Sequence, residues 1–365
     1  MPVTITPATS KVKTNLSDQY NFCLDKDIYL EVTDAVAKFL KIKYTITYKG
    51  TTTTAEFLYA IVKNVCRVQI GKPVQPYVYL SEADIDAFFS DLKIDMQPAD
   101  VAIELKLQNI EYEDLETFTL AAKFHAGYSS AIPADGSEVV RSLNFNTYLP
   151  LAYRFPTQNV DFVYKGKTKT YDKQAQSSAL NIFQMMFVQQ FHFADDSMVD
   201  AGFSSGFSSG FATADAIKNA NPFFKYEEGY INRINSAYTI KGVNFPWQRN
   251  SLNIIWLNES NIFNSLTFTG DKTASREFTH YINSFSKEFR NRKAGSLSEK
   301  KVKINSGWKL ASEISLFESL ISSTRAWIFD KPENRKEISV TSTKIMEEDT
   351  ARELIDFELE FNIDE

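Results

Sequence analysis

A strict alternation of apolar and polar residues in two well-separated segments constrains the fold of this chain more than any other feature. In residues 41–48 every second side chain, from Ile42 to Tyr48, is apolar or aromatic, and the side chains between them are Lys or Thr. In residues 355–364 apolar side chains alternate with Asp, Glu and Asn in the same way. A period of two places alternate side chains on opposite faces of an extended chain. Each segment is therefore predicted to be a β-strand with one buried face.

Other segments carry strand and turn signals of the same kind. Lys49 and Gly50 separate the first strand from a Thr-rich run that starts at residue 51, which predicts a β-hairpin. Residues 181–193 are apolar without a clear period, so helix and strand both remain open there. Further strand-like segments lie at residues 101–107, 161–171, 240–268 and 326–329.

Two short amphipathic helices are predicted within this strand-rich chain. The first begins at Ser81, which is followed three residues later by Asp84, a spacing that caps a helix N-terminus. The second begins after Ser312. Their apolar stripes are Ile85, Phe88, Phe89 and Leu92 in the first helix, and Ile314, Phe317, Leu320 and Ile321 in the second. We therefore expect a mainly β fold with a minor α+β component, built from antiparallel β-sandwich-like modules with a few short helices.

A length of 365 residues is enough for two to three domains. A loop-like stretch at residues 131–137 marks the first boundary. Residues 1–130 are expected to form a β-rich module with one helix. Residues 131–290 would be a middle β-rich domain or insertion, and residues 291–365 a basic linker followed by a C-terminal β module.

Composition narrows the function classes. Aromatic residues make up 14% of the chain, with 29 Phe and 17 Tyr, which suits broad, half-buried sheet faces. Lys and Arg number 40 against 46 Asp and Glu, so a net charge of −6 argues against nucleic acid as a partner. Two cysteines cannot form a disulfide framework. No secretory signal and no apolar run of about 18 residues is present, so we expect a soluble protein without a membrane span.

The most unusual segment is a tandem GFSS repeat at residues 202–211. It is interpreted as a pliable loop in which Phe203, Phe207 and Phe211 are candidate anchors for a partner. Two alternatives stay open. The three Phe side chains could fold back onto their own domain, or the glycines could line one face of a helix that packs closely against a neighbour.

An enzymatic interpretation of the same segment is weaker. Both repeats match G-x-S-x-G with Ser204 or Ser208 as nucleophile, and Asp271 and His280 follow in the order of a serine hydrolase. A nucleophile elbow needs a strand directly before its serine, however, and the residues before this segment are polar. We therefore expect no catalytic residues, and no enzyme.

Histidines give no metal site either. His192, Asp195 and Asp196 are residue types that a divalent metal accepts, but nothing else clusters with them in the sequence. A ligand set needs three or four groups. The expectation is therefore that the protein holds neither a metal nor a cofactor.

Two segments of opposite charge lie about fifty residues apart near the end of the chain. Residues 287–303 contain seven basic and two acidic residues, a net charge of +5, and residues 347–365 contain nine acidic and one basic, a net charge of −8. Either segment could be a solvated strand edge that avoids pairing. Alternatively, the acidic face of one subunit meets the basic segment of another. The candidate docking residues are Arg290, Arg292, Lys293, Lys300, Lys301, Asp356, Glu358 and Glu360.

Both ends of the chain are similar to a known family. The C-terminal pattern runs Lys303-x-Asn305-Ser306-Gly307-Trp308, then Ser312-Glu313, Trp327-x-x-Asp330 and Phe357-x-Leu359-Glu360-Phe361. It resembles the closing sheet domain of tail-tip and distal-tail proteins in siphophages and prophages of Bacteroidetes-type hosts. Residues 27–32 and 67–72, with the hairpin between them, are similar to the opening module of the same proteins. The middle third of the chain lies outside the resemblance.

This resemblance implies a structural virion protein of a tail tip or baseplate, made in the host cytoplasm and located in the virion tail. Its partners would be further copies of itself in a symmetric ring, other tail or baseplate proteins, and a host surface glycan. The family implies no catalytic residues. A sheet-rich glycan-binding or host-adhesion module is the alternative, with Trp247, Trp256 and Tyr230 as aromatics that could stack on sugars. A serine hydrolase is the remote third.

Overall fold

Strands dominate the computed structural model, which confirms the prediction of a mainly β fold. The described residues are 3–91, 93–132, 137–143, 147–154, 160–164, 167–171, 182–189, 228–233, 238–244, 252–285, 290–329, 334–342 and 354–363. Within these ranges the α-helices are α1 (Glu82–Asp91) and α5 (Ile314–Ile321), and the 3-10 helices are η1 (Gln75–Tyr77), η2 (Ser129–Ala131) and η4 (Ala311–Glu313). Neither α-helix is long and apolar enough to cross a membrane.

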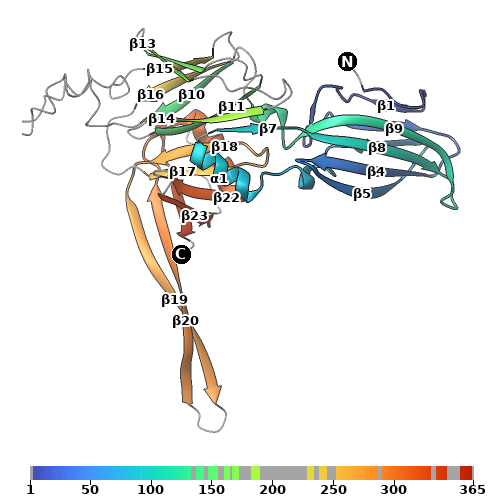
Figure 1. Ribbon diagram of the computed structural model, residues 1–365. Helices are drawn as coiled ribbons and strands as arrows, with labels where there is room; N and C mark the ends of the chain where they lie inside the picture. The colour runs from blue at the N-terminus through green and yellow to red at the C-terminus, as the bar shows by residue number, and fades with distance from the viewer. Residues whose placement is uncertain are drawn as a thin grey trace, which may run out of the picture.

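The N-terminal module is a β-sandwich (Figure 1). Its larger sheet has the strand order β2 (Asn21–Phe22), β9 (Asp114–His125), β8 (Ala99–Gln108), β4 (Phe39–Tyr48) and β5 (Thr51–Ala60). Its smaller sheet is β1 (Val12–Thr14), β3 (Tyr29–Thr33) and β6 (Val65–Gln69). The alternation predicted for residues 41–48 is confirmed, since Ile42, Tyr44 and Ile46 are buried in the core between the two sheets.

The hairpin predicted at residues 49–50 is confirmed as well. Tyr48 lies opposite Thr51 across a two-residue turn. Lys49 has a φ of 49° and Gly50 a φ of 80°, the left-handed pair that a tight hairpin turn requires. The turn fixes the register of β4 and β5 over ten residue pairs without a bulge.

Helix α1 forms where the sequence predicts it, but its apolar face packs outside the N-terminal sandwich. Ile85, Phe88 and Phe89 belong to a second core that is shared with strands near the C-terminus. The ring of Phe88 stacks on Phe263 with 3.9 Å between ring centroids. The strands involved are β17 (Leu252–Leu257), β18 (Phe263–Phe268) and β22 (Arg325–Phe329).

Strands from the middle of the chain form two further sheets. One pairs β11 (Thr147–Arg154) with β14 (Ile182–Gln189), and β14 with β7 (Lys93–Met96). Residues 181–193, open between helix and strand, thus contain a strand. The other sheet has the order β10 (Ser137–Leu143), β16 (Tyr238–Asn244), β15 (Glu228–Arg233), β12 (Val160–Tyr164) and β13 (Lys167–Tyr171). Strands β12 and β13 form the hairpin that residues 161–171 predict.

The C-terminal part contains a seven-stranded sheet. Its order is β18, β17, β22, β23 (Arg335–Val340), β25 (Glu358–Ile363), β20 (Arg290–Asn305) and β19 (Lys272–Phe285). A separate two-stranded sheet pairs β21 (Lys309–Leu310), which follows β20 in the chain, with β24 (Leu354–Ile355), which precedes β25. Helix α5 closes a third core through Phe317, which stacks on Phe357 at 4.3 Å. The alternation of the last strand is confirmed, with Leu359 and Phe361 buried and Glu360 exposed.

The three cores do not follow the domain boundaries expected from sequence. The second core contains Phe22 and Ile85 from residues 1–130, Ile182 from residues 131–290 and Trp327 from residues 291–365. The boundary expected between residues 290 and 291 falls at the start of β20, so the basic segment is a strand rather than a linker.

Candidate assembly surfaces

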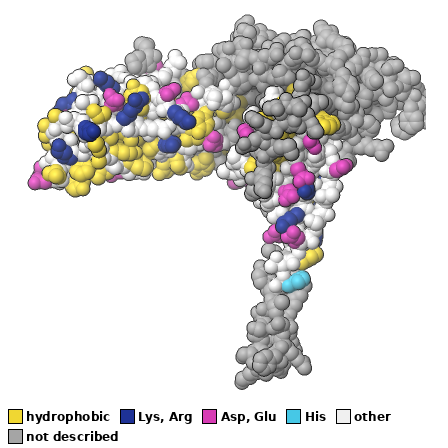
Figure 2. Space-filling view, turned by 180° about the vertical axis from the view of Figure 1, so that it is seen from behind, with side chains coloured by type: hydrophobic (Ala, Val, Ile, Leu, Met, Phe, Trp, Pro, Cys, Tyr) yellow, Lys and Arg dark blue, Asp and Glu magenta, His cyan; other side chains and the backbone are white. Residues whose placement is uncertain are grey.

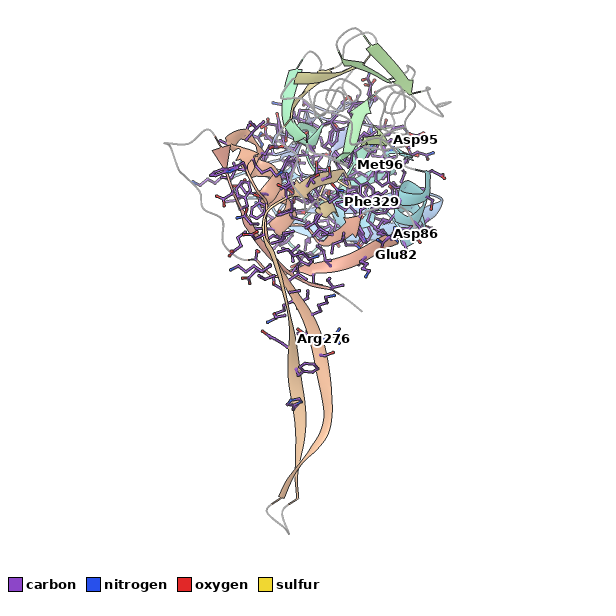
Figure 3. The ribbon with its side chains drawn as sticks, turned by 90° about the vertical axis from the view of Figure 1, so that its left-hand side faces the viewer. Glu82, Asp86, Asp95, Met96, Arg276 and Phe329 are labelled. Atoms are coloured by element: carbon purple, nitrogen blue, oxygen red, sulfur yellow. The ribbon has the colours of Figure 1, made fainter. Side chains whose placement is uncertain are left out.

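The feature of the structure best suited to contact another molecule is the hairpin of β19 and β20, which projects from the body (Figures 1 and 3). Residues 300–305 of β20 pair with β25 on one side and with β19 on the other. Beyond Arg276, which is labelled in Figure 3, the ladder contains β19 and β20 alone. We call residues 277–285 and 290–299 the arm. At about 3.3 Å per residue, its ten β20 residues extend roughly 33 Å from the sheet.

No third strand of the described structure pairs with the arm. The side chains of residues 271–280 are all exposed. Phe278, whose ring lies 6.4 Å from the ring of His280, is 56% exposed. A two-stranded ribbon without a third strand or a supporting surface is marginally stable in water. The arm would therefore gain stability from a contact with another molecule.

At the base of the arm, the basic strand and the acidic strand of the sequence lie next to each other in one chain. Lys303 faces Glu360 in the ladder of β20 and β25. Its ammonium lies 2.5 Å from a carboxylate oxygen of Glu358 and 3.5 Å from one of Glu360. The hydrogen bond to Glu358 is the main cause that raises the pKa of Lys303. Asn305 donates to Asp356 at 2.8 Å, and Lys301 lies 2.7 Å from Glu277.

Part of the charge attraction that the sequence suggests for docking is thus satisfied within one subunit. Lys300 lies opposite Ile363 in the same ladder. Arg290, Arg292 and Lys293 belong to the arm by their backbone pairing, and their side chains lie outside the description. The anchors Phe203, Phe207 and Phe211 lie outside the described residues.

The alternative sites of the sequence gain no support from the described geometry. Asp271 directly precedes β19 and His280 lies within it, nine residues further on, so at 3.3 Å per residue about 30 Å separates them and they cannot belong to one catalytic triad. Ser204, Ser208, His192, Asp195 and Asp196 lie outside the described residues. Among the residues that are described, no group of three His, Cys, Asp or Glu side chains could hold a metal ion.

The aromatic residues that the sequence offered for sugar stacking are not available as a described binding site. Trp256 is fully buried in the third core, where its indole nitrogen donates to Ser319 at 3.0 Å, so it cannot contact a sugar. Trp247 lies outside the described residues, and so does the side chain of Tyr230 on β15.

A cleft that the sequence did not reveal lies at the turn end of the β4–β5 hairpin. Its volume is about 320 Å³. Lys49 in the hairpin turn forms an ion pair of 2.5 Å with Asp84 of α1. Burial opposes ionisation of Asp84, but hydrogen bonds from Lys49 and Ser81 outweigh it and lower the pKa of the carboxyl. The lining residues are Ile46, Tyr48, Lys49, Thr51, Thr53, Tyr77, Tyr79, Ser81 and Asp84. No motif in the sequence pointed to this cleft, because its lining comes from β4, β5 and residues 77–84, which only the fold brings together.

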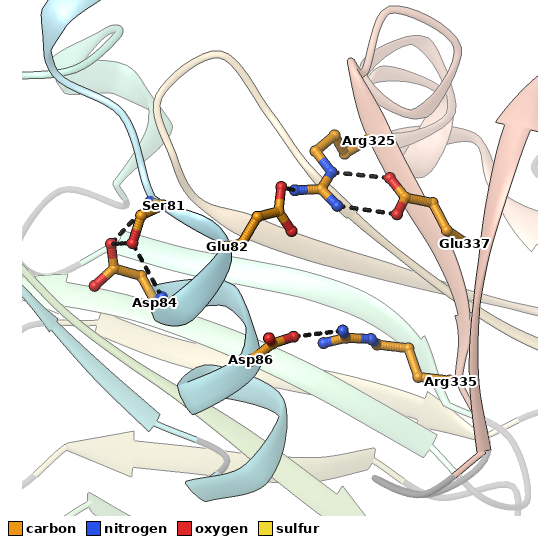
Figure 4. Close-up of polar contacts among 7 residues, drawn as sticks. All are labelled: Ser81, Glu82, Asp84, Asp86, Arg325, Arg335 and Glu337. Carbon is orange, nitrogen blue, oxygen red and sulfur yellow. Dashed lines mark hydrogen bonds and ion pairs between the residues drawn. The ribbon is translucent and has the colours of Figure 1, made fainter.

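Helix α1 is held on the C-terminal sheet by two arginines (Figure 4). Arg325 contacts Glu82 of the helix and donates two hydrogen bonds of 2.9 Å to Glu337 on β23. Arg335 donates to Asp86 at 2.6 Å. The hydrogen bonds to Glu337 are the main cause that raises the pKa of Arg325. The helix is thereby fixed to the sheet from which the arm projects.

A turn at residues 258–262, between β17 and β18, joins the N-terminal sandwich to the rest of the molecule. Ser260 accepts a hydrogen bond from the backbone N–H of Tyr128, and Asn261 donates to the carbonyl of Val78. The buried Gln184 of β14 donates to the carbonyl of Asn261 at 2.7 Å. These contacts set the direction of the sandwich relative to the arm. No periodic signal in the sequence points to them.

No family model and no curated protein matches this chain.

Proposed function

We propose that this protein is a structural component of a phage-like tail tip or baseplate, which assembles as a symmetric homo-oligomer and docks neighbouring tail proteins. The observation that carries the proposal is the arm, a two-stranded ribbon that leaves the seven-stranded sheet and pairs with no third strand among the described residues. The resemblance of both chain ends to distal-tail and tail-tip proteins supports the tail as its location. On this proposal it is located in the virion tail after synthesis in the host cytoplasm.

Assembly by this protein needs positioning rather than chemistry. The body is held together by three hydrophobic cores, by Arg325 and Arg335, which bind α1, and by the turn at residues 258–262. Together these contacts fix the direction of the arm. The arm presents the exposed ring of Phe278 to a neighbour, and the basic residues Arg290, Arg292 and Lys293 belong to its backbone ladder. Aromatic and arginine side chains are the types most enriched at protein interfaces.

Shortening the arm tests the assembly part of the proposal. Residues 277–299 are replaced by an Asn-Gly turn, which keeps the pairing of residues 300–305 with β25. Light scattering behind a sizing column, at low and high salt, gives the mass of each protein. The full chain is expected to form a defined oligomer that loosens with salt, and the shortened protein is expected to form an assembly of fewer subunits. Circular dichroism and thermal unfolding of the shortened protein verify that the body is folded. An oligomer of unchanged subunit number without the arm would overturn the proposal.

The location is tested directly on tail-bearing particles released by the organism that encodes the protein. Immunogold electron microscopy with an antibody against the protein is expected to label one end of the tail. Label on the capsid or on no part of the particle would contradict a place at the tail tip or baseplate.

A glycan-binding or host-adhesion function is the second candidate, and the cleft beside Lys49 favours it. Tyr79 is 62% exposed at a cleft that also offers Thr hydroxyls and a Lys–Asp ion pair. Aromatic faces with a few polar groups suit a sugar ring. Binding on a glycan array that is lost in Tyr79→Ala, and kept in the matched control Tyr112→Ala, would support it. Tyr112 is 57% exposed and is not among the residues that line the cleft.

A further inference from the structure

Strand β5 is an exposed edge of the larger N-terminal sheet, and no described strand pairs with its outer side. Figure 2 shows apolar side chains gathered along the margin of the N-terminal module where β5 lies in Figure 1. Phe57 and Leu58 on β5 are 38% and 50% exposed, Val62 just beyond the strand is 64% exposed, and Val65 at the start of β6 is 42% exposed.

The backbone of β5 offers a regular row of unpaired groups. Because Tyr48 and Thr51 flank a two-residue turn, hydrogen-bonded and non-hydrogen-bonded pairs alternate from there along β4 and β5. The residues of the non-hydrogen-bonded pairs turn their N–H and C=O groups outward. On β5 these residues are Thr52, Thr54, Glu56, Leu58 and Ala60.

Edges of this kind normally carry devices that prevent pairing. Typical devices are lysines or prolines on the strand, a bulge, or a very short strand. Strand β5 has ten residues, no Lys, no Pro and no bulge. Its only charge, Glu56, lies 2.8 Å from Lys41 on β4. The strand is therefore suited to pair with another strand.

We propose that the occupant of this edge is β5 of a second copy, in an antiparallel pair whose two-fold axis passes through Phe57. Charge excludes one register, and an aromatic pair favours the one centred on Phe57. A pair centred on Glu56 would set two carboxylates opposite each other, which is unfavourable. A pair centred on Phe57 sets Glu56 opposite Leu58 of the second copy and joins the two Phe rings at the axis. Aromatic cross-strand pairs stabilise sheets.

The same reasoning disfavours the arm as occupant. Lys41 and Lys43 lie on the outer face of β4, directly beside β5. The basic strand of an arm placed there would meet like charges. A β5 pair about a two-fold axis makes an isologous contact that joins two five-stranded sheets into one of ten strands.

Cysteine cross-linking in the full chain tests the pair and its register. In the proposed register the two Phe57 residues form a non-hydrogen-bonded pair, with Cα atoms about 4.5 Å apart, a distance that a disulfide spans. Phe57→Cys is expected to form a covalent dimer under mild oxidation. Ala55 would lie about 13 Å from its counterpart, too far for a disulfide, so Ala55→Cys is the matched control. The unmodified chain, whose Cys23 and Cys66 are buried, is the second control.

A charge exchange gives an independent test. Leu58→Glu places a carboxylate opposite Glu56 of the second copy and should weaken dimerisation about tenfold. Adding Glu56→Lys turns that contact into an opposite-charge pair and should restore the dimer. No cross-link in Phe57→Cys, equal cross-linking in Ala55→Cys, or no rescue by the double variant would each overturn the proposal.

This inference rests on the self-assembly part of the proposed function, but its test separates the two. Phe57→Cys is expected to cross-link equally in the protein with a shortened arm. A cross-link that persists while arm shortening leaves the oligomer unchanged would contradict the arm and keep the β5 pair. An oligomer that depends on the arm but gives no Phe57→Cys cross-link would contradict the β5 pair and keep the arm.

Discussion

The guanidinium carbon of Arg335 lies 4.6 Å from the centroid of the Phe89 ring, above a helix that belongs by sequence to the N-terminal third of the chain. The same guanidinium group donates to Asp86 at 2.6 Å. Arg335 thus binds one face of α1 by a charge and by an aromatic contact at once. This relationship joins the two ends of the chain into one body.

Removing either arginine should loosen α1. Arg325→Ala leaves Glu82 and Glu337 without their shared partner, and we expect a loss of about 1–3 kcal/mol in the free energy of unfolding. Arg335→Ala should cost a similar amount. Lys336→Ala, at an exposed position on the same strand, is the control and should change stability by less than about 0.5 kcal/mol. Urea unfolding, followed by tryptophan fluorescence, measures the free energy of unfolding of all three variants. An Arg325→Ala protein as stable as the control would show that the arginine contacts do not hold α1 on the sheet.

Glycine 127 should tolerate no side chain, because the N-terminal sandwich meets the turn at residues 258–262 there. A Cβ on Gly127 would lie 1.9 Å from Oγ of Ser260, and the residue has a φ of +70°. We expect Gly127→Ala to lose about 2–4 kcal/mol of stability. Gly50→Ala is the matched control. Its φ is +80°, but no atom lies within 4 Å of the added Cβ, so only the backbone cost of about 1 kcal/mol remains. Equal losses in the two variants would show that the contact with Ser260 is unimportant.

Stability should rise with pH above neutrality because of Lys309. Burial lowers the pKa of this side chain to about 8, although Glu313 acts in the opposite direction. The folded protein therefore releases the proton near pH 8, whereas the unfolded chain keeps it to about pH 10.5. Between these values the unfolded state binds more protons, so unfolding becomes less favourable as the pH rises. Lys309→Met removes this gain, and the difference between the two proteins should change by roughly 2–3 kcal/mol from pH 7.5 to 10.5. Urea unfolding measures both proteins across that range. A difference in their free energies of unfolding that stays constant from pH 7.5 to 10.5 would contradict the assignment.

The Asp84 carboxylate should contribute stability that is lost in acid. Its pKa is lowered in the folded state, so its contribution is present above about pH 4 and disappears as the pH falls through the folded value. Asp84→Asn should cost about 1–2 kcal/mol at pH 7, because the amide cannot serve as acceptor for both Ser81 and Lys49 as a carboxylate does. Asp91→Asn, at the other end of α1, is the control. If both variants lose stability equally from pH 6 to 3, the role assigned to Asp84 is wrong.

Local structure could be predicted from the sequence wherever one face of an element is buried and the other is not. That condition holds for residues 41–48 and for β25, where the alternation is unbroken. It fails for β14, in which the polar Gln184 is fully buried beside Ile182, so no alternation marks the strand. Helix α1 was predicted from its stripe and cap, but a stripe does not specify the surface on which it packs. Phe263 and Trp327, which receive it, lie far away in the sequence.

Much less of the candidate surfaces could be predicted. The basic and acidic segments are evident from composition, yet their pairing within one sheet depends on the antiparallel register of β20 and β25. The exposed edge of β5 depends on strand order, which no local pattern encodes. The turn at residues 258–262 acts through single hydrogen bonds from Ser260 and Asn261, residue types that are ordinary in any turn.

The packing of α1 also has a consequence for synthesis on the ribosome. Asp86 and Arg335 are separated by 249 residues. At about 5–20 residues per second, the helix leaves the ribosome on the order of 10 to 50 s before its partner strand is made. Until Phe263, Trp327 and Phe329 have been made, Ile85, Phe88 and Phe89 lack the aromatic residues of the C-terminal sheet that cover them. A chain that terminates early would keep this apolar face uncovered, and the cell's chaperones and proteases could recognise it as incomplete.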